Sequence, residues 1–446
     1  MTTLEEQLGG AQNVIGGPFG SKLTQKDYVN KGVPVIRGSN MVSAGRWLGG
    51  DFAFVSEEKL EADLRSNLAQ PGDIIVTQRG TLGQVAIVPE HGGFNKYVIS
   101  QSQMAVRVPH QKADRDFVFY FLQSPQFSDY VETSTIQTGV PHINLGILRN
   151  APATWPKREQ QNQIASVLAV LDDKIELNGR MNETLEAMAR AIFKDWFVDF
   201  GPTRAKVEGR APYLAHHLWD LFPDALDDEG KPVGWRTTSI AEIAARIAMG
   251  PFGSRIKKDN FVDAGTPVIR GKNLSNGFVD DDFVFLNEAK KTELSRSIAR
   301  PGDIVFTHRG TLGQVGRIPL GARYAEYVVS QSQLLLSVDT NQVGKLYVYR
   351  FFKSELGQSA WLASSSGAGV PAIARPSTTL REIQLTVPDQ VLGSRFEALT
   401  TSIEARQLAL TRETRTLTQT RDLLLPKLMS GDVHLAVAEK AVEARA

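Results

Sequence analysis

Residues 71–85 read PGDIIVTQRGTLGQV, and residues 301–315 read PGDIVFTHRGTLGQV. The second stretch begins 230 residues after the first (301 − 71), and they differ only at Ile75/Val305, Val76/Phe306 and Gln78/His308. Each predicts a strand, a tight turn that needs glycine, and a second strand, which together form a β-hairpin. Solenoid repeats have periods of about 20–50 residues, so a period this long indicates a duplicated domain.

Four further short motifs are duplicated in the same order. They are Gly-Pro-Phe-Gly-Ser at 17–21 and 250–254, Pro-Val-Ile-Arg-Gly at 34–38 and 267–271, Ser-Gln-Ser-Gln at 100–103 and 330–333, and Gly-Val-Pro at 139–141 and 369–371. Short β-branched runs bounded by Gly and Pro predict strands, and we expect each module to be a mixed α/β domain. The apolar runs at 116–122 and 345–352 predict either a short packing helix or a buried strand. Two like modules on one chain suit the binding of two like partners.

The composition limits the classes of protein to which the chain can belong. A chain of 446 residues is long enough for two or three domains with their own cores. It has no cysteine, which excludes disulfide and thiolate chemistry. The N-terminus lacks a signal-peptide pattern, and no apolar run reaches the roughly 18 residues of a membrane span, so we expect a cytoplasmic location and no membrane partner. The formal net charge of +1 means that binding to nucleic acid would depend on local basic patches.

A long amphipathic helix is predicted after each module. From Pro156 to Asp199 the helix would be roughly 65 Å long at about 1.5 Å per residue. The predicted packing residues are Ile164, Leu168, Leu171, Ile175, Leu185, Met188, Ile192 and Trp196 in the first helix, and Phe396, Leu399, Ile403, Leu410, Leu417, Leu424 and Leu428 in the second. Asn178 and Asn182 interrupt the first stripe, and such polar seam residues fix register at some cost in stability. We expect the helices to pack antiparallel, with the modules related by a pseudo-twofold axis.

These patterns divide the chain into five parts. We predict a first module at 1–155, a spacer helix at 156–200, a connector at 201–235, a second module at 236–387, and a distal helix with its tail at 388–446. The tail after Gly431 is expected to be frayed or disordered.

The duplicated loops are the candidate DNA-binding elements. Arg79 and the backbone beside it suit a phosphate, while Thr81 or Gln84 would reach bases. The candidate residues are Phe19, Ser21, Lys22, Arg37, Arg79, Thr81 and Gln84 in the first module, and Phe252, Ser254, Arg255, Arg270, Arg309, Thr311 and Gln314 in the second. The alternatives are structural: a turn that needs only its glycines, a Phe19 that fills the core, and an Arg37 that pairs with a carboxylate such as Asp73.

Catalytic and metal-binding patterns are missing from the sequence. The histidines lack metal-ligand spacing, no Walker lysine follows the Gly-rich loops, and neither a serine-nucleophile motif nor the Asn/Asp-Pro-Pro-aromatic motif of adenine methyltransferases occurs. The acidic pair Asp172-Asp173 is expected to be a solvated helix surface. We therefore expect a chain that is not an enzyme and binds neither metal nor cofactor.

The order of these motifs resembles the specificity subunit of type I restriction–modification systems. The resemblance rests on the two Gly-Pro-Phe-Gly-Ser loops, the two Arg-Gly-Thr-Leu-Gly hairpins, the helix start at 155–161, and Leu-Leu-Leu-Pro-Lys-Leu-Met-Ser-Gly at 423–431. It covers nearly the whole chain, but residues 388–390 do not repeat the Gln-rich helix start at 159–163.

The resemblance implies two α/β target-recognition domains separated by two long conserved helices. It implies a non-catalytic subunit that reads a bipartite double-stranded DNA target. Two methyltransferase subunits using S-adenosylmethionine would dock on the helices, and restriction or translocase subunits using ATP and magnesium would join them in a prokaryotic cytoplasm. The alternative is a tandem-module protein-binding scaffold without DNA specificity.

Overall fold

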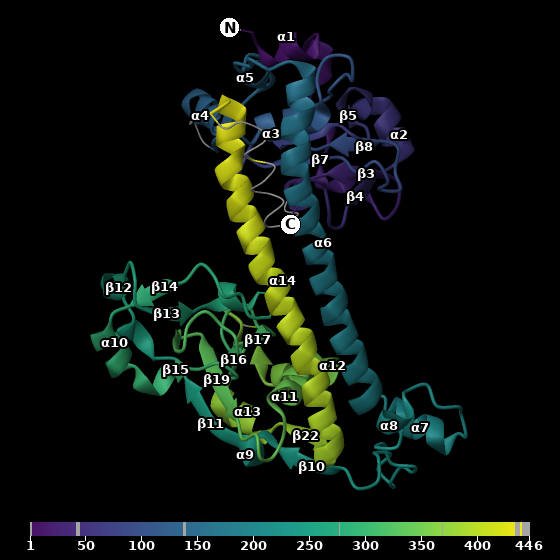
Figure 1. Cartoon of the computed structure of the whole chain (residues 1–446), viewed down its shortest axis with the longest axis vertical. Helices are drawn as coiled ribbons and strands as arrows, with labels where there is room; N and C mark the ends of the chain where they lie inside the picture. Colours follow the sequence, from purple (N-terminus) through teal and green to yellow (C-terminus); the bar gives the residue numbers. More distant parts are fainter. Residues whose placement is uncertain are drawn as a thin grey trace. The chain divides into compact units, whose positions relative to one another are not determined.

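The computed structural model describes residues 2–41, 45–136, 140–275, 277–367, 369–432 and 438. The chain divides into two compact units, Met1–Arg180 with Leu410–Ala446, and Met181–Ala409. The first unit contains the first module and the second unit contains the second. Each unit also contains part of the two long helices, α6 (Arg158–Phe197) and α14 (Gln390–Ser430) (Figure 1). The predicted tail lies outside the described residues beyond Asp432, except for Ala438.

The two modules have the same sheet topology. In the first, a four-stranded antiparallel sheet has the order β1 (Val14–Gly16), β9 (Gln103–Val106), β6 (Ile74–Thr77), β7 (Val85–Ile87). A five-stranded sheet has the order β2 (Tyr28–Val29), β4 (Ala53–Val55), β3 (Val33–Ile36), β8 (Tyr97–Ile99), β5 (Leu68–Ala69), in which β3 and β8 run parallel. The predicted hairpin is confirmed as β6 and β7, with Val76 opposite Val85.

The second module repeats this order with its own strands. Its sheets are β11 (Ala244–Met249), β19 (Gln333–Val338), β16 (Ile304–Thr307), β17 (Val315–Arg317), and β12 (Phe261–Val262), β14 (Val284–Leu286), β13 (Thr266–Ile269), β18 (Tyr327–Val329), β15 (Ile298–Ala299). Two small ladders, β10 (Arg236–Ser239) with β22 (Gln384–Val387) and β20 (Ser365–Ser366) with β21 (Ala372–Ile373), occur in this unit.

Helices cover the sheets and connect them. In the first unit they are α1 (Leu4–Leu8), α2 (Glu57–Lys59), α3 (Arg115–Phe121), α4 (Pro125–Ser134) and α5 (Leu145–Arg149). In the second they are α7 (Gly201–Val207), α8 (His216–Trp219), α9 (Ile240–Ile243), α10 (Glu288–Glu293), α11 (Lys345–Lys353), α12 (Glu355–Leu362) and α13 (Pro376–Glu382). The open choice between helix and strand for the two apolar runs is thereby settled as helices α3 and α11. Among the described residues, none of the helices has the length and apolar character that crossing a bilayer requires.

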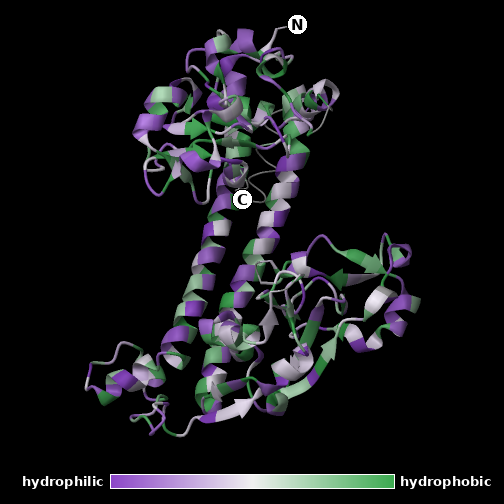
Figure 2. Ribbon diagram, turned by 180° about the vertical axis from the view of Figure 1, so that it is seen from behind, coloured by the Kyte–Doolittle hydropathy of each residue, from purple (hydrophilic) through white to green (hydrophobic). Residues whose placement is uncertain are grey.

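Strand alternation explains the layers of each module. In β6, Ile74 and Val76 point to one face and join the core cluster that contains Phe117 of α3. Ile75 points to the other face and packs with Tyr97 of the five-stranded sheet. Successive side chains of a strand point to opposite faces, so a fully buried run such as 74–77 predicts a strand covered on both sides. Figure 2 shows these strands as largely hydrophobic, whereas hydrophilic and hydrophobic residues alternate along α6 and α14.

The long helices pair antiparallel within each unit, as predicted. In the first unit Asn178 is buried and its side-chain amide donates to a carboxylate oxygen of Glu413 over 2.9 Å. In the second, the rings of Phe193 and Phe396 lie 5.8 Å apart. The helix α14 begins at Gln390, where Asp389 accepts from the backbone N–H groups of the first turn, although the sequence there departs from the family pattern.

The packing stripe of α6 differs from the prediction in its second half. Met188 is 49% exposed, and Leu185 and Ile192 are only half-buried. Ala189 and Phe193 are buried instead. A straight helix of 3.6 residues per turn drifts by about 20° per heptad, so a strict seven-residue stripe leaves the buried face over this distance. Leu424 is likewise half-buried while its neighbour Leu425 is buried; the other predicted stripe residues are buried apart from the half-buried Leu399.

Candidate nucleic-acid interface

Three duplicated motifs meet at one edge of each module. In the first module, the backbone N–H of Gln78 donates to Ser102 O over 2.8 Å, which joins the hairpin to the Ser-Gln-Ser-Gln turn. The N–H of Gly17 donates to Gln103 O over 3.2 Å, which joins the Gly-Pro-Phe-Gly-Ser loop to the same turn. The second module repeats both bonds, from His308 to Ser332 and from Gly250 to Gln333, each at 2.9 Å. The segments duplicated in sequence are therefore neighbours in space.

Glycine at 17 and 250 permits this approach. A Cβ at Gly17 would lie 2.0 Å from Ser100 O, and one at Gly250 would lie 1.8 Å from Ser330 O. Both contacts are far below van der Waals distance and involve backbone, so the loop would have to move away from the turn. Glycine conservation between the modules at this position thus has a structural cause.

The phenylalanines of the two loops point outward. Phe19 is 79% exposed and Phe252 is 75% exposed. This excludes the alternative in which Phe19 fills the core. An exposed ring held on a backbone-anchored loop is suited to apolar contact with base edges.

The Gly-Val-Pro motif contributes a second exposed apolar residue in each module. Val140 is 55% exposed and Val370 is 57% exposed. The segment that follows pairs with the hairpin: the N–H of Ile143 donates to Gln78 O over 3.0 Å, and that of Gly310 donates to Pro371 O over 2.8 Å. The sequence interpretation missed these valines as site residues, although their duplication was the available signal. Gly139 lies outside the described residues.

Each module carries two exposed cations on its duplicated loops. Lys22, Arg79, Arg255 and Arg309 are exposed, and within the described part of the chain none of them forms an ion pair. Ser21, Thr81 and Thr311 are exposed as well; the Ser254 side chain lies outside what the structure describes. Unpaired cations beside exposed apolar groups form a local basic patch on a chain that is nearly neutral as a whole.

The arginines that follow the Pro-Val-Ile strands are half-buried. Arg37 donates from Nη2 to Asp51 O, and Arg270 donates to Asp282 O, each over 3.4 Å. The alternative partner for Arg37 is excluded, because Asp73 binds both Nε (2.9 Å) and Nη2 (2.7 Å) of Arg107. The two candidate arginines are held by backbone carbonyls alone at these contacts.

The glutamines of the hairpins bind within their own modules. Thr77 Oγ1 donates to Gln84 Oε1 over 3.3 Å, and Thr307 Oγ1 donates to Gln314 Oε1 over 3.0 Å. In the second module, Gln314 and Arg270 line an open pocket of about 340 Å³ together with Arg309 and the Ser-Gln-Ser-Gln turn. Base contact by these glutamines remains a prediction.

Comparison with known proteins shows what the chain is similar to. Residues 14–187 match the family described as "Type I restriction modification DNA specificity domain". The chain is 22% identical over 383 residues to the type I restriction enzyme MjaIX specificity subunit of Methanocaldococcus jannaschii, covering 85% of this chain and 81% of the relative. It is 23% identical over 384 residues to the HindI specificity subunit of Haemophilus influenzae, covering 76% and 82%.

Residues 14–187 thus match this specificity domain, and over most of its length the chain is similar to the specificity subunits of type I restriction enzymes. Its fold is similar to the crystal structure of the S subunit from M. genitalium, with a TM-score of 0.50, 16% identity and coverage of 93% of both chains. The fold class predicted from the resemblance is confirmed.

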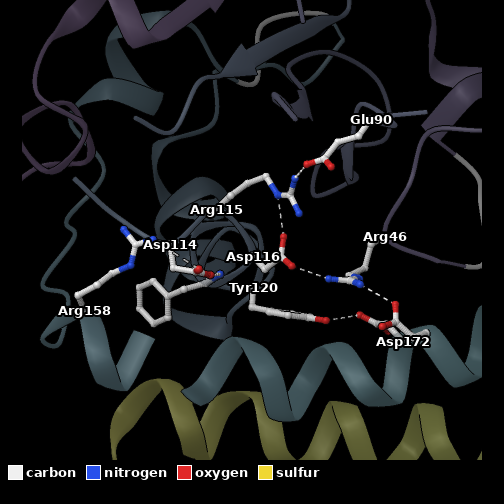
Figure 3. Close-up of polar contacts among 10 residues, drawn as sticks. Arg46, Glu90, Asp114, Arg115, Asp116, Tyr120, Arg158 and Asp172 are labelled. Carbon is white, nitrogen blue, oxygen red and sulfur yellow. Dashed lines mark hydrogen bonds and ion pairs between the residues drawn. The ribbon is translucent and has the colours of Figure 1, made fainter. Parts of the chain in front are cut away.

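Each module is tied to the long helices by buried polar groups. Tyr120 of α3 donates to Asp172 Oδ2 of α6 over 2.7 Å, and Arg46 pairs with Asp116 at 2.7 Å (Figure 3). Arg46 also pairs with Asp173 of α6 at 2.5 Å. Asp172 is only 3% exposed, so the expectation of a solvated acidic pair is wrong for this residue. Residues facing Asp172 come from distant parts of the chain, which a local reading of the sequence does not include.

Burial and the Asp172 carboxylate raise the pKa of Tyr120 well above its ordinary value, so the phenol remains a hydrogen-bond donor. In the second module the corresponding helix residue is Arg350, which pairs with Glu186 of α6 at 2.7 Å. The modules thus share their loops but are anchored by different chemistry.

His308 is the principal polar difference between the two hairpins. Its counterpart Gln78 is half-exposed, whereas His308 is buried. Burial lowers the pKa of His308, whose Nε2 is buried without a hydrogen-bond partner among the described residues. Gln78, in contrast, donates from Nε2 to Gln101 O. No cluster of three or more His, Asp or Glu that could hold a metal occurs among the residues described.

Proposed function

We propose that this specificity subunit is the non-catalytic DNA-reading component of a type I restriction–modification complex, with a bipartite double-stranded target. The observation that carries the proposal is the paired surface: each module presents an exposed Phe and Val beside an exposed Arg, on loops anchored to one turn. A cation for phosphate and apolar groups for base edges are the two parts of a specific DNA contact. The duplication supplies one such surface for each half-site.

The partners belong to the same proposal. Two methyltransferase subunits that use S-adenosylmethionine dock on the long helices, and restriction or translocase subunits that use ATP and magnesium join the assembly. Apolar side chains left exposed on these helices support docking; they are Val170, Leu177, Met188, Val391 and Leu423, with 45–62% exposure. Exposed apolar residues on a long helix suit packing against a partner.

The test compares DNA binding by the subunit co-expressed with its methyltransferase partner. We expect a complex of two methyltransferase subunits to one specificity subunit, whose affinity for DNA falls steeply with salt. Arg79→Ala and Arg309→Ala should each weaken binding and lower the salt slope by about one unit. Arg65→Ala and Arg296→Ala, which remove exposed arginines of the same modules outside the loop cluster, are the matched controls.

Two outcomes would contradict this proposal. If both loop variants bind the target DNA as tightly as the wild type, the loops are structural. If the wild-type complex binds DNA without sequence preference or salt dependence, the protein-binding scaffold is the better explanation.

A further inference from the structure

Arg375 has an unusual backbone conformation. It precedes α13 with φ 46° and ψ 56°, and it is one of three non-glycine residues with positive φ in the described part of the chain. A left-handed conformation is strained for a residue with a Cβ, and proline at the next position restricts the backbone further. Glycine would adopt this conformation without strain. Strained residues with large side chains concentrate at functional sites.

The side chain of Arg375 lies at the proposed DNA surface. With Arg309, Phe252 and Val370 it lines an open pocket of about 640 Å³, whose wall also carries the hydroxyl residues Ser366, Ser377 and Thr378. Arg375 is exposed, and neither arginine forms an ion pair with a carboxylate of the described residues. Two exposed arginines therefore line one opening, and neither is paired with a carboxylate of the described residues.

The first module has no cation at the equivalent sequence position. Aligning the two Gly-Val-Pro motifs places Leu145 at the position of Arg375. Leu145 is half-buried and packs beside Gly16, where a Cβ would lie 3.0 Å from its Cδ1. The nearby Arg149 is occupied structurally, because its Nη2 donates to Ala11 O and Val14 O, both over 3.0 Å.

We propose that Arg375 and Arg309 form a phosphate clamp present only in the second module. The ligand is a DNA backbone phosphate, since paired guanidinium groups with hydroxyls alongside match its oxygens. The clamp rests on the proposed function and deepens it: the second half-site is bound through one more backbone contact than the first. The strain at Arg375 is retained because it places the side chain in the opening.

The decisive variant is Arg375→Gly in the complex with methyltransferase subunits. Glycine removes the side chain and relieves the left-handed strain, so the melting temperature should stay equal or rise. Affinity for a duplex carrying both half-sites should fall by about five- to tenfold, and the salt slope should fall by about one unit. Arg375→Lys should lose less affinity than Arg375→Gly, because a charge remains. Arg381→Ala, which removes an exposed arginine of α13 that does not line the pocket, should bind as the wild type does.

Three results would overturn the clamp. The first is a stable Arg375→Gly variant with unchanged affinity and salt slope. The second is a loss of affinity that depends on one base pair of the second half-site, which would make Arg375 a base reader. The third is an equal loss in Arg381→Ala, which would indicate a general effect of charge. If Arg309→Ala weakens binding and Arg375→Gly does not, the clamp fails and the proposed function stands. If none of Arg79→Ala, Arg309→Ala and Arg375→Gly weakens binding, the proposed function fails as well.

Discussion

Tyr120 and Asp172 form a buried hydrogen bond of 2.7 Å between a module and a long helix. Arg421 of α14 donates to the other carboxylate oxygen of Asp172 over 2.8 Å. One carboxylate thus joins three elements of the first unit: α3, α6 and α14. Since the module carries the loops that we propose to contact DNA, this contact helps to hold them on the helices.

Removal of this carboxylate should destabilise the first unit. Asp172→Ala leaves the Tyr120 hydroxyl without its acceptor and removes one of the two carboxylates that Arg421 binds, so we expect a loss of about 1–3 kcal/mol in unfolding free energy. Urea denaturation measures it, and Glu183→Ala, which removes an exposed carboxylate of the same helix, is the control. A loss no larger than that of the control would show that the contact is dispensable.

The exposed phenylalanines should matter for binding and not for stability. Phe19→Ala and Phe252→Ala remove rings that are more than 70% exposed, so each should change the unfolding free energy by less than about 0.5 kcal/mol. Each should still weaken DNA binding, at a different half-site. Thermal denaturation and binding to duplexes with one half-site altered separate the two effects. A large loss of stability would show that the rings pack against the protein.

His308 should make stability depend on pH in the acidic range. Burial lowers the pKa of this histidine in the folded state, whereas its pKa in the unfolded chain is about 6.5. Below that pH the unfolded state binds a proton that the folded state does not, so stability is lost as pH falls. His308→Gln, which installs the residue of the first module, should make the decline below about pH 6.5 less steep. Denaturation midpoints between pH 5 and 8 test this, with the exposed His91→Gln as control.

The likeness of the two loop clusters predicts the form of the DNA target. Phe19/Phe252, Arg79/Arg309 and Thr81/Thr311 are identical pairs, so the half-sites should be partly inverted repeats of each other. Exchanging residues 71–85 with 301–315 should change the methylated sequence little, whereas exchanging 39–50 with 272–280 should alter one half-site. Genome-wide mapping of methylated adenine would read out both. Two wholly dissimilar half-sites would show that the shared loops serve the fold and backbone contact only.

The sequence by itself determined the duplication, the hairpins, the two long helices and the family, because these features are encoded in short-range patterns. Alternation along β6 and the glycines of its turn depend on residues a few positions apart. For the same reason, helix α6 begins and ends within two residues of its predicted limits, Pro156 and Asp199.

Only the tertiary structure decided which residues face solvent and which face one another. The local sequence predicts that Asp172 is a surface residue. In the structure it is bonded to Tyr120, 52 residues before it, and to Arg421, 249 residues after it. Met188 fits the predicted heptad stripe, but in the structure it lies off the buried face of α6 and is exposed. The exposure of Phe19, the partner of Asp73 and the left-handed backbone of Arg375 likewise depend on long-range packing. Such contacts are set by how whole elements fill space, and that information is absent from any local window of the chain.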